Sequence, residues 1–413
     1  MSVTAPTPDV PTIWKVISVG EVCEVQNGFA FKSTYFNHSE GLPIIRIRDV
    51  HSGRSDTRYS GFYDDKYIVN DDDLLVGMDG EFRVRKWRSG IGLLNQRVCR
   101  IIPNGGQIIA DFLYYSIRRP LKQIEDFTPY TTVKHISARQ IRDIEIPLPP
   151  LFEQKKIAHI LSSVQEAIET QERIIQTTTE LKKALMQKLF TEGLRREPKK
   201  QTEIGLVPES WEVKKIGEIA TLKSGGTPSR KKPEYWKGGD IPWVKTCEVD
   251  YCTVHETEEK ITKAGLDGSS AKLFPAGTLL MAMYGQGITR GKVALLGLEA
   301  STNQACVAFF PNQEVDSKYL YYYFEYSYDD IRNFAHGANQ KNLSANIIKT
   351  FPVSYPSDKK EQKEIAGALE KLDTKKHIHL KKKKAYQDLF RTLLHELMTV
   401  KIRVHKLDLS NPG

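Results

Sequence analysis

The chain has 413 residues, of which 40% are hydrophobic and 27% are charged, with 20 Pro and 28 Gly. This composition supports two or three folded domains and excludes a disordered chain, a collagen-like chain and a small disulfide scaffold. The net charge of +9 favours an anionic partner. The sequence has no apolar run of the roughly 20 residues that span a membrane and no N-terminal signal segment, so we expect a soluble, cytoplasmic protein with no membrane partner.

The first part of the chain, 1–150, is expected to be a strand-rich domain. Short apolar runs at 42–48 and 73–76 are separated by Gly, Pro and Asn-Asp turns, a texture typical of β-strands. The aromatic segment 112–117 is predicted to be helical. A proline-rich segment at 147–150 marks the end of this domain.

Residues 151–195 are predicted to form a long amphipathic helix, followed by a polar linker at 196–208. From 151 to 192 the segment has no Pro or Gly, and its apolar residues recur at spacings of three, four and seven. Those that define the stripe and are expected to pair with another helix or to contact a partner subunit are Ile157, Leu161, Val164, Ile168, Leu185 and Leu189.

The second part of the chain repeats this pattern. Residues 209–357 have the texture of the first domain, with a predicted strand at 278–283 and a predicted helix at 319–324. Residues 358–405 form the second helical segment, whose stripe includes Ile365, Leu369, Leu393 and Leu397. Neither long helix can bury its stripe alone, so we expect an antiparallel, coiled-coil-like pair. The alternative is that each helix packs separately on its own domain.

Matching blocks at an offset of about 200 residues identify an internal repeat. Trp14–Glu21 corresponds to Trp211–Glu218, Asn95-Gln96 to Asn303-Gln304, and Glu153-Gln154 to Glu361-Gln362. The predicted fold class is therefore α+β, with two tandem α/β domains, two long antiparallel helices and an internal pseudo-two-fold repeat.

Signatures of catalysis are absent from the sequence. It contains no phosphate-binding Gly-x4-Gly-Lys-Ser/Thr, no His-Glu-x-x-His and no Asn/Asp-Pro-Pro-Tyr/Phe of an amino-methyltransferase. Asp79-Gly-Glu81 offers a weak alternative as a nuclease metal site, against a simple polar turn. We therefore expect no catalytic residue, no metal ligand and no cofactor in this chain.

Basic, amide and aromatic side chains in both domains are candidates for DNA binding, because cations contact phosphates while Arg and amides read base edges. Each of them has the alternative of being a solvated surface group. The candidates are Arg46, Arg48, Arg54, Arg58, Arg83, Arg85, Lys86, Arg88, Arg230, Lys231, Lys232, Lys245, Tyr284, Gln286, Arg290, Gln340 and Lys341.

Over nearly its whole length the sequence resembles the specificity subunit of type I restriction-modification systems. The resemblance rests on the blocks at 146–158, 181–191 and 204–213, and on Ser224-Gly-Gly-Thr-Pro-Ser229 followed by Tyr235-Trp236 and Ile241-Pro-Trp243. The second repeat departs from the pattern at Tyr355-Pro356-Ser357, where the first has Pro-Leu-Pro-Pro, and this leaves the start of the second helix open.

The resemblance implies a non-catalytic subunit in the cytoplasm of a bacterium or archaeon. Each domain would be a target-recognition domain that reads one half of a bipartite, asymmetric site in double-stranded DNA, while the helices separate the halves and dock two methyltransferase subunits. Those partners would carry S-adenosylmethionine and methylate adenine at N6, and motor-nuclease subunits would use ATP and Mg²⁺. The alternatives are a DNA-binding adaptor or repressor of another defence system, and a self-sufficient methyltransferase or nuclease.

Overall fold

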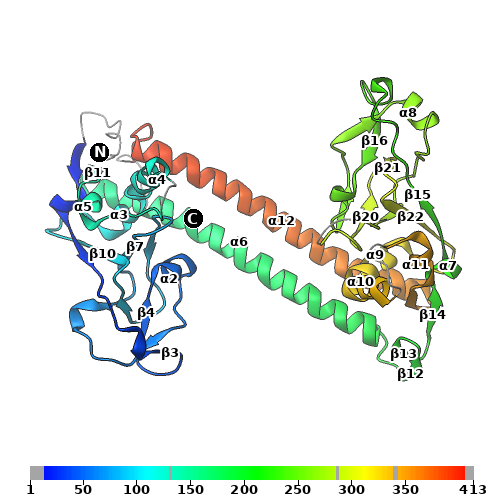
Figure 1. Cartoon of the computed structure of the whole chain (residues 1–413), viewed down its shortest axis with the longest axis horizontal. Coiled ribbons are helices and arrows are strands. Elements are labelled where there is room, and N and C mark those ends of the chain that lie inside the picture. The colour runs from blue at the N-terminus through cyan, green and yellow to red at the C-terminus, as the bar shows by residue number, and fades with distance from the viewer. Residues whose placement is uncertain (1–13, 130–132, 285–287, 338–342, 405–413) are drawn as a thin grey trace. The chain divides into compact units, whose positions relative to one another are not determined.

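A computed structural model describes residues 14–129, 133–284, 288–337 and 343–404 (Figure 1). The chain divides into two compact units. Unit 1 comprises Met1–Gln171 and Lys381–Gly413, and unit 2 comprises Glu172–Leu380. Both units mix helices with sheets, which confirms the α+β class and the tandem arrangement.

Unit 1 is built on two sheets. A four-stranded antiparallel sheet has the order β2-β10-β7-β8, and a five-stranded sheet has the order β3-β5-β4-β9-β6, in which β4 and β9 run parallel. A separate pair, β1 with β11, joins the two ends of the domain in sequence. The strands are β1 (Lys15–Ser18), β2 (Cys23–Asn27), β3 (Phe36–Asn37), β4 (Leu42–Ile45), β5 (Arg58–Tyr59), β6 (Ile68–Val69), β7 (Leu74–Gly77), β8 (Val84–Lys86), β9 (Gly92–Leu94), β10 (Val98–Pro103) and β11 (Glu145–Leu148).

Helices α3 and α4 form the predicted helical region of unit 1. The expectation for 112–117 is confirmed, because α3 covers most of that segment and buries Phe112 and Leu113. The short helices of this unit are α1 (Val19–Val22), η1 (Ser33–Tyr35), α2 (Ile47–Ser52), η2 (Asp65–Tyr67), α3 (Ala110–Ser116), α4 (Arg118–Phe127) and α5 (Ala138–Arg142).

Unit 2 repeats this layout. A five-stranded sheet has the order β15-β22-β19-β20-β17, and a three-stranded sheet has the order β18-β16-β21 with β16 and β21 parallel. Strand β14 pairs with β23 as β1 pairs with β11. The strands are β12 (Lys199–Thr202), β13 (Gly205–Pro208), β14 (Trp211–Lys215), β15 (Ala220–Ser224), β16 (Ile241–Val244), β17 (Cys252–Val254), β18 (Glu259–Ile261), β19 (Leu279–Ala282), β20 (Val293–Leu296), β21 (Ser301–Thr302), β22 (Cys306–Pro311) and β23 (Pro352–Pro356).

The predicted strand at 278–283 and helix at 319–324 of unit 2 are confirmed by β19 and α9. The short helices of this unit are α7 (Ile216–Ile219), η3 (Pro233–Tyr235), η4 (Thr246–Glu248), α8 (Lys263–Asp267), α9 (Ser317–Tyr326), α10 (Tyr328–Gly337) and α11 (Ala345–Thr350). Helix α9 buries a run of aromatic residues against the sheet, including Tyr319 and Phe324.

Two long helices, α6 (Leu151–Glu192) and α12 (Lys359–Met398), contribute to both units. In unit 1 the beginning of α6 lies beside the end of α12, and Glu153 accepts from Arg403 at 3.3 Å. In unit 2 the end of α6 lies beside the beginning of α12, and Arg195 pairs with Glu361 at 3.2 Å. The helices are therefore antiparallel within each unit.

Each long helix also packs on both globular parts, a feature that neither packing expectation contained. The core of unit 1 includes Ile157 and Leu161 of α6 together with Phe390 and Leu397 of α12. Each unit thus combines the globular part of one repeat with helical segments from both repeats, and the helical segments are not separate bodies.

The predicted linker at 196–208 contains secondary structure, because β12 and β13 pair in it as a hairpin with Glu203 and Ile204 at the tip and Gly205 at a φ of +103°. One expectation about local structure is wrong. The run 42–48 is not one strand. It turns into α2 after Ile45, since the Asp49 carboxylate accepts from the Arg46 backbone N–H and caps the helix start.

Gly367, in the interior of α12, is expected to weaken the helix. A Cβ added there meets no heavy atom within 4 Å, so Gly367→Ala should raise the free energy of unfolding by about 1 kcal/mol through helix propensity alone. Thermal unfolding should show a higher Tm. The matched variant Gly265→Ala in α8 should lower the Tm instead, because its Cβ would lie 2.6 Å from the Tyr235 carbonyl oxygen. A lower Tm for Gly367→Ala would contradict this account.

Among the described residues, none of the helices is both long enough and apolar enough to cross a membrane.

Candidate nucleic-acid interface

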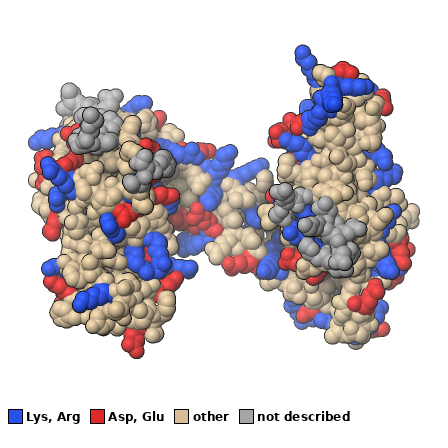
Figure 2. Space-filling model, viewed as in Figure 1, with Lys and Arg blue, Asp and Glu red and all other residues tan. Residues whose placement is uncertain are grey.

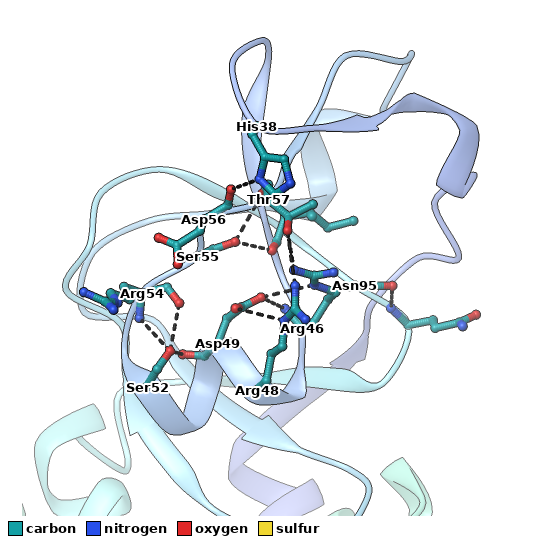
Figure 3. Close-up of polar contacts among 12 residues, drawn as sticks. His38, Arg46, Arg48, Asp49, Ser52, Arg54, Ser55, Asp56, Thr57 and Asn95 are labelled. Carbon is teal, nitrogen blue, oxygen red and sulfur yellow. Dashed lines mark hydrogen bonds and ion pairs between the residues drawn. The ribbon is translucent and has the colours of Figure 1, made fainter. Parts of the chain in front are cut away.

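The start of α2 in unit 1 gathers several polar side chains (Figure 3). Arg46 occupies the N-cap position, and its backbone N–H donates to Asp49 Oδ2 at 2.9 Å. Its guanidinium donates to Thr57 Oγ1 at 2.5 Å, while Asp49 is buried beneath it. Because its guanidinium is tied to Thr57, Arg46 is held in one conformation at the surface.

Arg48 and Arg54 flank this cluster and are exposed to solvent. The Arg48 side chain is 68% exposed, and its Nη2 lies 3.3 Å from Thr57 Oγ1. Arg54 points away from the cluster in Figure 3. Its loop is tied to β4, because Ser55 Oγ donates to the Ile44 carbonyl at 2.7 Å. Figure 2 shows Lys and Arg side chains gathered on unit 1 where Figure 1 places α2, so this surface presents positive charge.

Two further turns meet the start of α2. The Asn95 backbone N–H donates to the Ile45 carbonyl at 3.2 Å, and the Gln96 N–H donates to the Phe29 carbonyl at 2.9 Å. A Cβ on Gly28 would lie 2.1 Å from the Asn95 carbonyl oxygen, so only Gly allows this approach. The turns at Gly28, Arg46 and Asn95 therefore form one three-segment scaffold.

Unit 2 builds the same three-segment scaffold. The Lys245 backbone N–H donates to Glu248 Oε2 at 2.6 Å, as Arg46 does to Asp49. The Asn303 N–H donates to the Val244 carbonyl at 3.3 Å, and a Cβ on Gly225 would lie 2.2 Å from the Thr302 carbonyl oxygen. The backbone is shared between the repeats, whereas the side chains that it carries differ.

The loop before η3 adds a basic cluster to unit 2. The Arg230 guanidinium lies 3.6 Å from the centroid of the Trp236 ring, which stands edge-on to Trp243 at 5.1 Å. The hydrogen bond from Arg230 lowers the pKa of the Glu259 carboxyl, so this pair stays charged. Lys231 is exposed, and Lys232 Nζ lies 2.9 Å from the Tyr235 hydroxyl.

Several predicted DNA-binding residues are held by contacts within their own unit. Arg58 donates to the Gly41 carbonyl at 2.7 Å, Arg85 donates to the Val50 and His51 carbonyls, and Lys86 pairs with Asp72 and Asp111. Lys245 pairs with Glu258, and Arg290 is only 7% exposed. These contacts give Arg58, Arg85, Lys86 and Lys245 structural roles, whereas Arg290 is buried. The binding of all five residues to DNA stays a prediction.

The remaining predicted DNA-binding residues are more accessible or lie outside the residues that the structure describes. Arg83 and Arg88 are exposed but lie near Glu81 and Asp72, at 2.6 and 3.7 Å. Tyr284 is 39% exposed. Gln286, Gln340 and Lys341 lie outside the described residues.

Asp79, considered above as a metal ligand, has protein partners. Its carboxylate lies 2.5 Å from His135 Nδ1 and 3.5 Å from Arg97 Nε. In the described part of the chain, no group of three or more His, Cys, Asp or Glu side chains is arranged to hold a metal ion.

The ten apolar residues proposed for the long helices all lie in or against the two main cores. The core of unit 1 contains Ile157, Leu161, Ile168 and Leu397, with Val164 and Leu393 packed against it, and the core of unit 2 contains Leu189, Ile365 and Leu369, with Leu185 packed against it. Their proposed contact with a partner subunit stays a prediction.

Gly28, Gly225 and the two Asn residues were not among the residues predicted for a site. A signal was present in the sequence, because Asn95 and Asn303 occupy matching positions in the repeat. Buried Gln154 and Gln362 were not predicted either, although their carboxamides fasten the long helices to the domains.

Comparison with known proteins places the chain among DNA-specificity proteins. Residues 11–180 and 208–386 match the type I restriction modification DNA specificity domain. The EcoBI specificity subunit of Escherichia coli is 39% identical over 211 residues, 48% of this chain and 44% of that protein, so this match spans less than half of the relative. The MjaVIII specificity subunit of Methanocaldococcus jannaschii is 26% identical over 97% of this chain and 95% of that protein.

A solved structure has the same fold over nearly the whole length. The S subunit of a type I restriction-modification system from M. genitalium superimposes with a TM-score of 0.68 at 18% identity, covering 95% of this chain and 99% of that one. The two segments that match the family model, 11–180 and 208–386, together cover most of the chain, one in each repeat. The chain therefore belongs to the type I restriction modification DNA specificity family.

Proposed function

We propose that the chain is a DNA-recognition subunit that binds a bipartite, asymmetric site in double-stranded DNA, one half with each repeat. The observation that supports this most strongly is the three-segment scaffold, which both repeats share while carrying different side chains on it. A shared backbone lets both domains dock on a duplex in the same way, and different side chains read different bases.

The proposal assigns the chemistry to other subunits. Two methyltransferase subunits would bring S-adenosylmethionine and methylate adenine at N6, one for each repeat, and motor-nuclease subunits would bring ATP and Mg²⁺. Two equivalent docking sites are expected because each repeat supplies one domain and one long helix, and the two long helices match at an offset of 208 residues.

The test is a genome-wide map of N6-methyladenine in cells that express this chain with its neighbouring methyltransferase, compared with cells lacking only this chain. A split motif that disappears when the chain is removed is the expected result. If the methyltransferase is active and its motif does not depend on this chain, the proposal fails and a DNA-binding adaptor of another system takes its place. Turnover by the purified chain alone would support a self-sufficient enzyme instead.

Arg48 and Arg54 are expected to contact phosphates, because they are exposed beside the scaffold of unit 1. The variant Arg48→Ala/Arg54→Ala should weaken binding to the cognate duplex about 10-fold and reduce the slope of log K against log salt by about 2. Fluorescence anisotropy of the methyltransferase complex over a salt series measures both quantities.

The matched control for this double variant is Arg119→Ala, at an exposed position of α4. In Figure 1, α4 lies at the other end of unit 1 from β3 and β4. This substitution should leave the affinity within about twofold, as expected for a surface charge outside the interface. Equal losses for the two variants would show that net charge, rather than this surface, governs binding.

A further inference from the structure

A buried charge cluster joins the end of α6 to unit 2. Lys182 Nζ lies 2.7 Å from both Glu325 and Asp373, and the Lys182 side chain is only 10% exposed. Tyr322 completes the cluster, since its hydroxyl donates to Asp373 at 3.0 Å and its ring lies 5.0 Å from Lys182 Nζ. One cation is therefore matched to two carboxylates.

The equivalent junction in unit 1 has a different chemistry. Residues of the long helices correspond at an offset of 208, so Phe390 stands where unit 2 has Lys182, and Gln165 stands where it has Asp373. Phe390 lies 6.0 Å from the Tyr115 ring and 5.5 Å from the Arg118 guanidinium. These contacts identify Tyr115 and Arg118 as the counterparts of Tyr322 and Glu325.

The globular part therefore presents a positive group, Arg118, to the long helix in unit 1 and a negative group, Glu325, in unit 2. Burial raises the pKa of the Glu325 carboxyl, which means that its charged form depends on a cation nearby, chiefly Lys182 and more weakly Lys376. In unit 1, Nη1 of Arg118 is buried and has no hydrogen-bond partner among the described residues, so a second cation there would be repelled.

We propose that this exchange of charge makes each half of the chain pair with the other half and disfavours pairing of like halves from two copies of the chain. We define the N-half as 1–203 and the C-half as 204–413. In a pair of N-halves, Lys182 would replace Phe390 and meet Arg118 and Gln165 in place of the carboxylates of Glu325 and Asp373. In a pair of C-halves, Phe390 would replace Lys182 and leave Glu325 and Asp373 without their main cation.

The contacts at the ends of the long helices do not discriminate between mixed pairs and pairs of like halves. Arg195 pairs with Glu361 at 3.2 Å, and Arg403 pairs with Glu153 at 3.3 Å, so both junctions use an arginine and a glutamate at the same offset of 208 residues. Like halves would satisfy these pairs equally well. The choice of partner therefore depends on the buried cluster, and it does not rest on the proposed binding of DNA.

The test uses the assembled full chain with a protease site inserted between Glu203 and Ile204, which are exposed at the tip of the β12–β13 hairpin. Two batches of this chain are purified, each with its own tag on the N-half and its own tag on the C-half. Both batches are cleaved and mixed in urea, and the urea concentration is raised until C-halves exchange completely between the batches. After dilution, capture through one N-half tag and native mass spectrometry measure how many complexes contain two N-halves.

For the unaltered chain we expect pairs of N-halves to be disfavoured about 100-fold or more relative to mixed pairs. Lys182→Phe makes the end of α6 resemble that of α12, and it should raise the fraction of N-half pairs at least 10-fold over the matched control Lys183→Phe, an exposed neighbour. Statistical pairing in the unaltered chain, or equal fractions in the two variants, would overturn the proposal.

A second variant keeps the test decisive if Lys182→Phe alone does not fold. Lys182→Phe/Glu325→Arg/Asp373→Gln gives unit 2 the same groups that unit 1 has in Phe390, Arg118 and Gln165. It should restore mixed pairs while allowing pairs of N-halves at a similar level. If this variant excludes pairs of N-halves as strongly as the unaltered chain does, the buried cluster does not control pairing.

Discussion

Exchange of residues 209–357 for the corresponding segment of another family member is expected to change one half of the recognised DNA site and leave the other half unaltered. The ends of this segment lie side by side, because β14 pairs with β23 from Trp211 opposite Pro356 to Lys215 opposite Pro352. Each altered base pair costs about 1–3 kcal/mol, so three altered pairs would cost about 3–9 kcal/mol of binding free energy on the original site.

Methylation mapping of cells that express the chimera measures this outcome. Tyr322 and Glu325 lie inside the exchanged segment, and both should be kept in the chimera because they contact Lys182 of α6. The reciprocal exchange of residues 14–150 is the control, and it should change only the opposite half of the motif. A change in both halves after either exchange would argue that the two domains do not read DNA independently.

Gln362→Leu is expected to destabilise unit 2 by about 3 kcal/mol or more, because it leaves buried backbone groups unpaired. The Gln362 side chain accepts from the Asp316 N–H at 2.8 Å and donates to the Glu314 and Pro356 carbonyls, each at 2.8 Å. For a unit of this size the Tm should fall by about 6–12 °C, as calorimetry would measure.

The control for Gln362→Leu is the same substitution at Gln176, an exposed residue of α6 in unit 2. It should change the free energy of unfolding by no more than about 0.5 kcal/mol. Equal losses of stability at the two positions would show that the buried hydrogen bonds are not the cause.

The repeat predicts a second position with the same effect. Gln154 accepts from the Ile109 N–H at 3.0 Å and donates to the Gln107 and Pro149 carbonyls at 2.8 and 2.9 Å. Each carboxamide therefore fastens the start of a long helix to the loop before α3 or α9 and to the strand end that precedes the helix. Conservation of this network between the repeats explains why Glu-Gln is among the blocks that match at an offset of 208.

The departure of the second repeat at Tyr355-Pro356-Ser357 does not disturb this junction. Tyr355 is buried in β23, and its hydroxyl lies 3.2 Å from Glu212 and 3.1 Å from Glu314. The Pro356 carbonyl still accepts from Gln362, and α12 begins at Lys359. The start of the second helix, left open by the sequence, is thus placed by the β14–β23 pair and by Gln362.

Local patterns predicted the candidate site less well than the fold. Arg46, Arg85 and Arg58 look alike in sequence, yet Arg46 occupies the N-cap position of α2 and the other two donate to backbone carbonyls. Trp87 stands among basic residues in the sequence, yet its side chain is buried in a second hydrophobic cluster of unit 1. The sequence shows which residues are basic, but their accessibility depends on hydrogen-bond acceptors from segments that are distant in sequence.

The sequence alone determined the repeat, the two long amphipathic helices and the family, because periodicity and matching blocks can be read from the order of the residues. It favoured an antiparallel pair of helices but left separate packing of each helix open. The tertiary structure decided which half of each helix packs on which globular part and which cations remain exposed. It also revealed that Lys182 and Phe390, at equivalent positions, meet opposite charges. The physical reason is that burial and ion pairing depend on contacts between residues more than 100 positions apart, such as Lys182 with Glu325, and no local pattern records them.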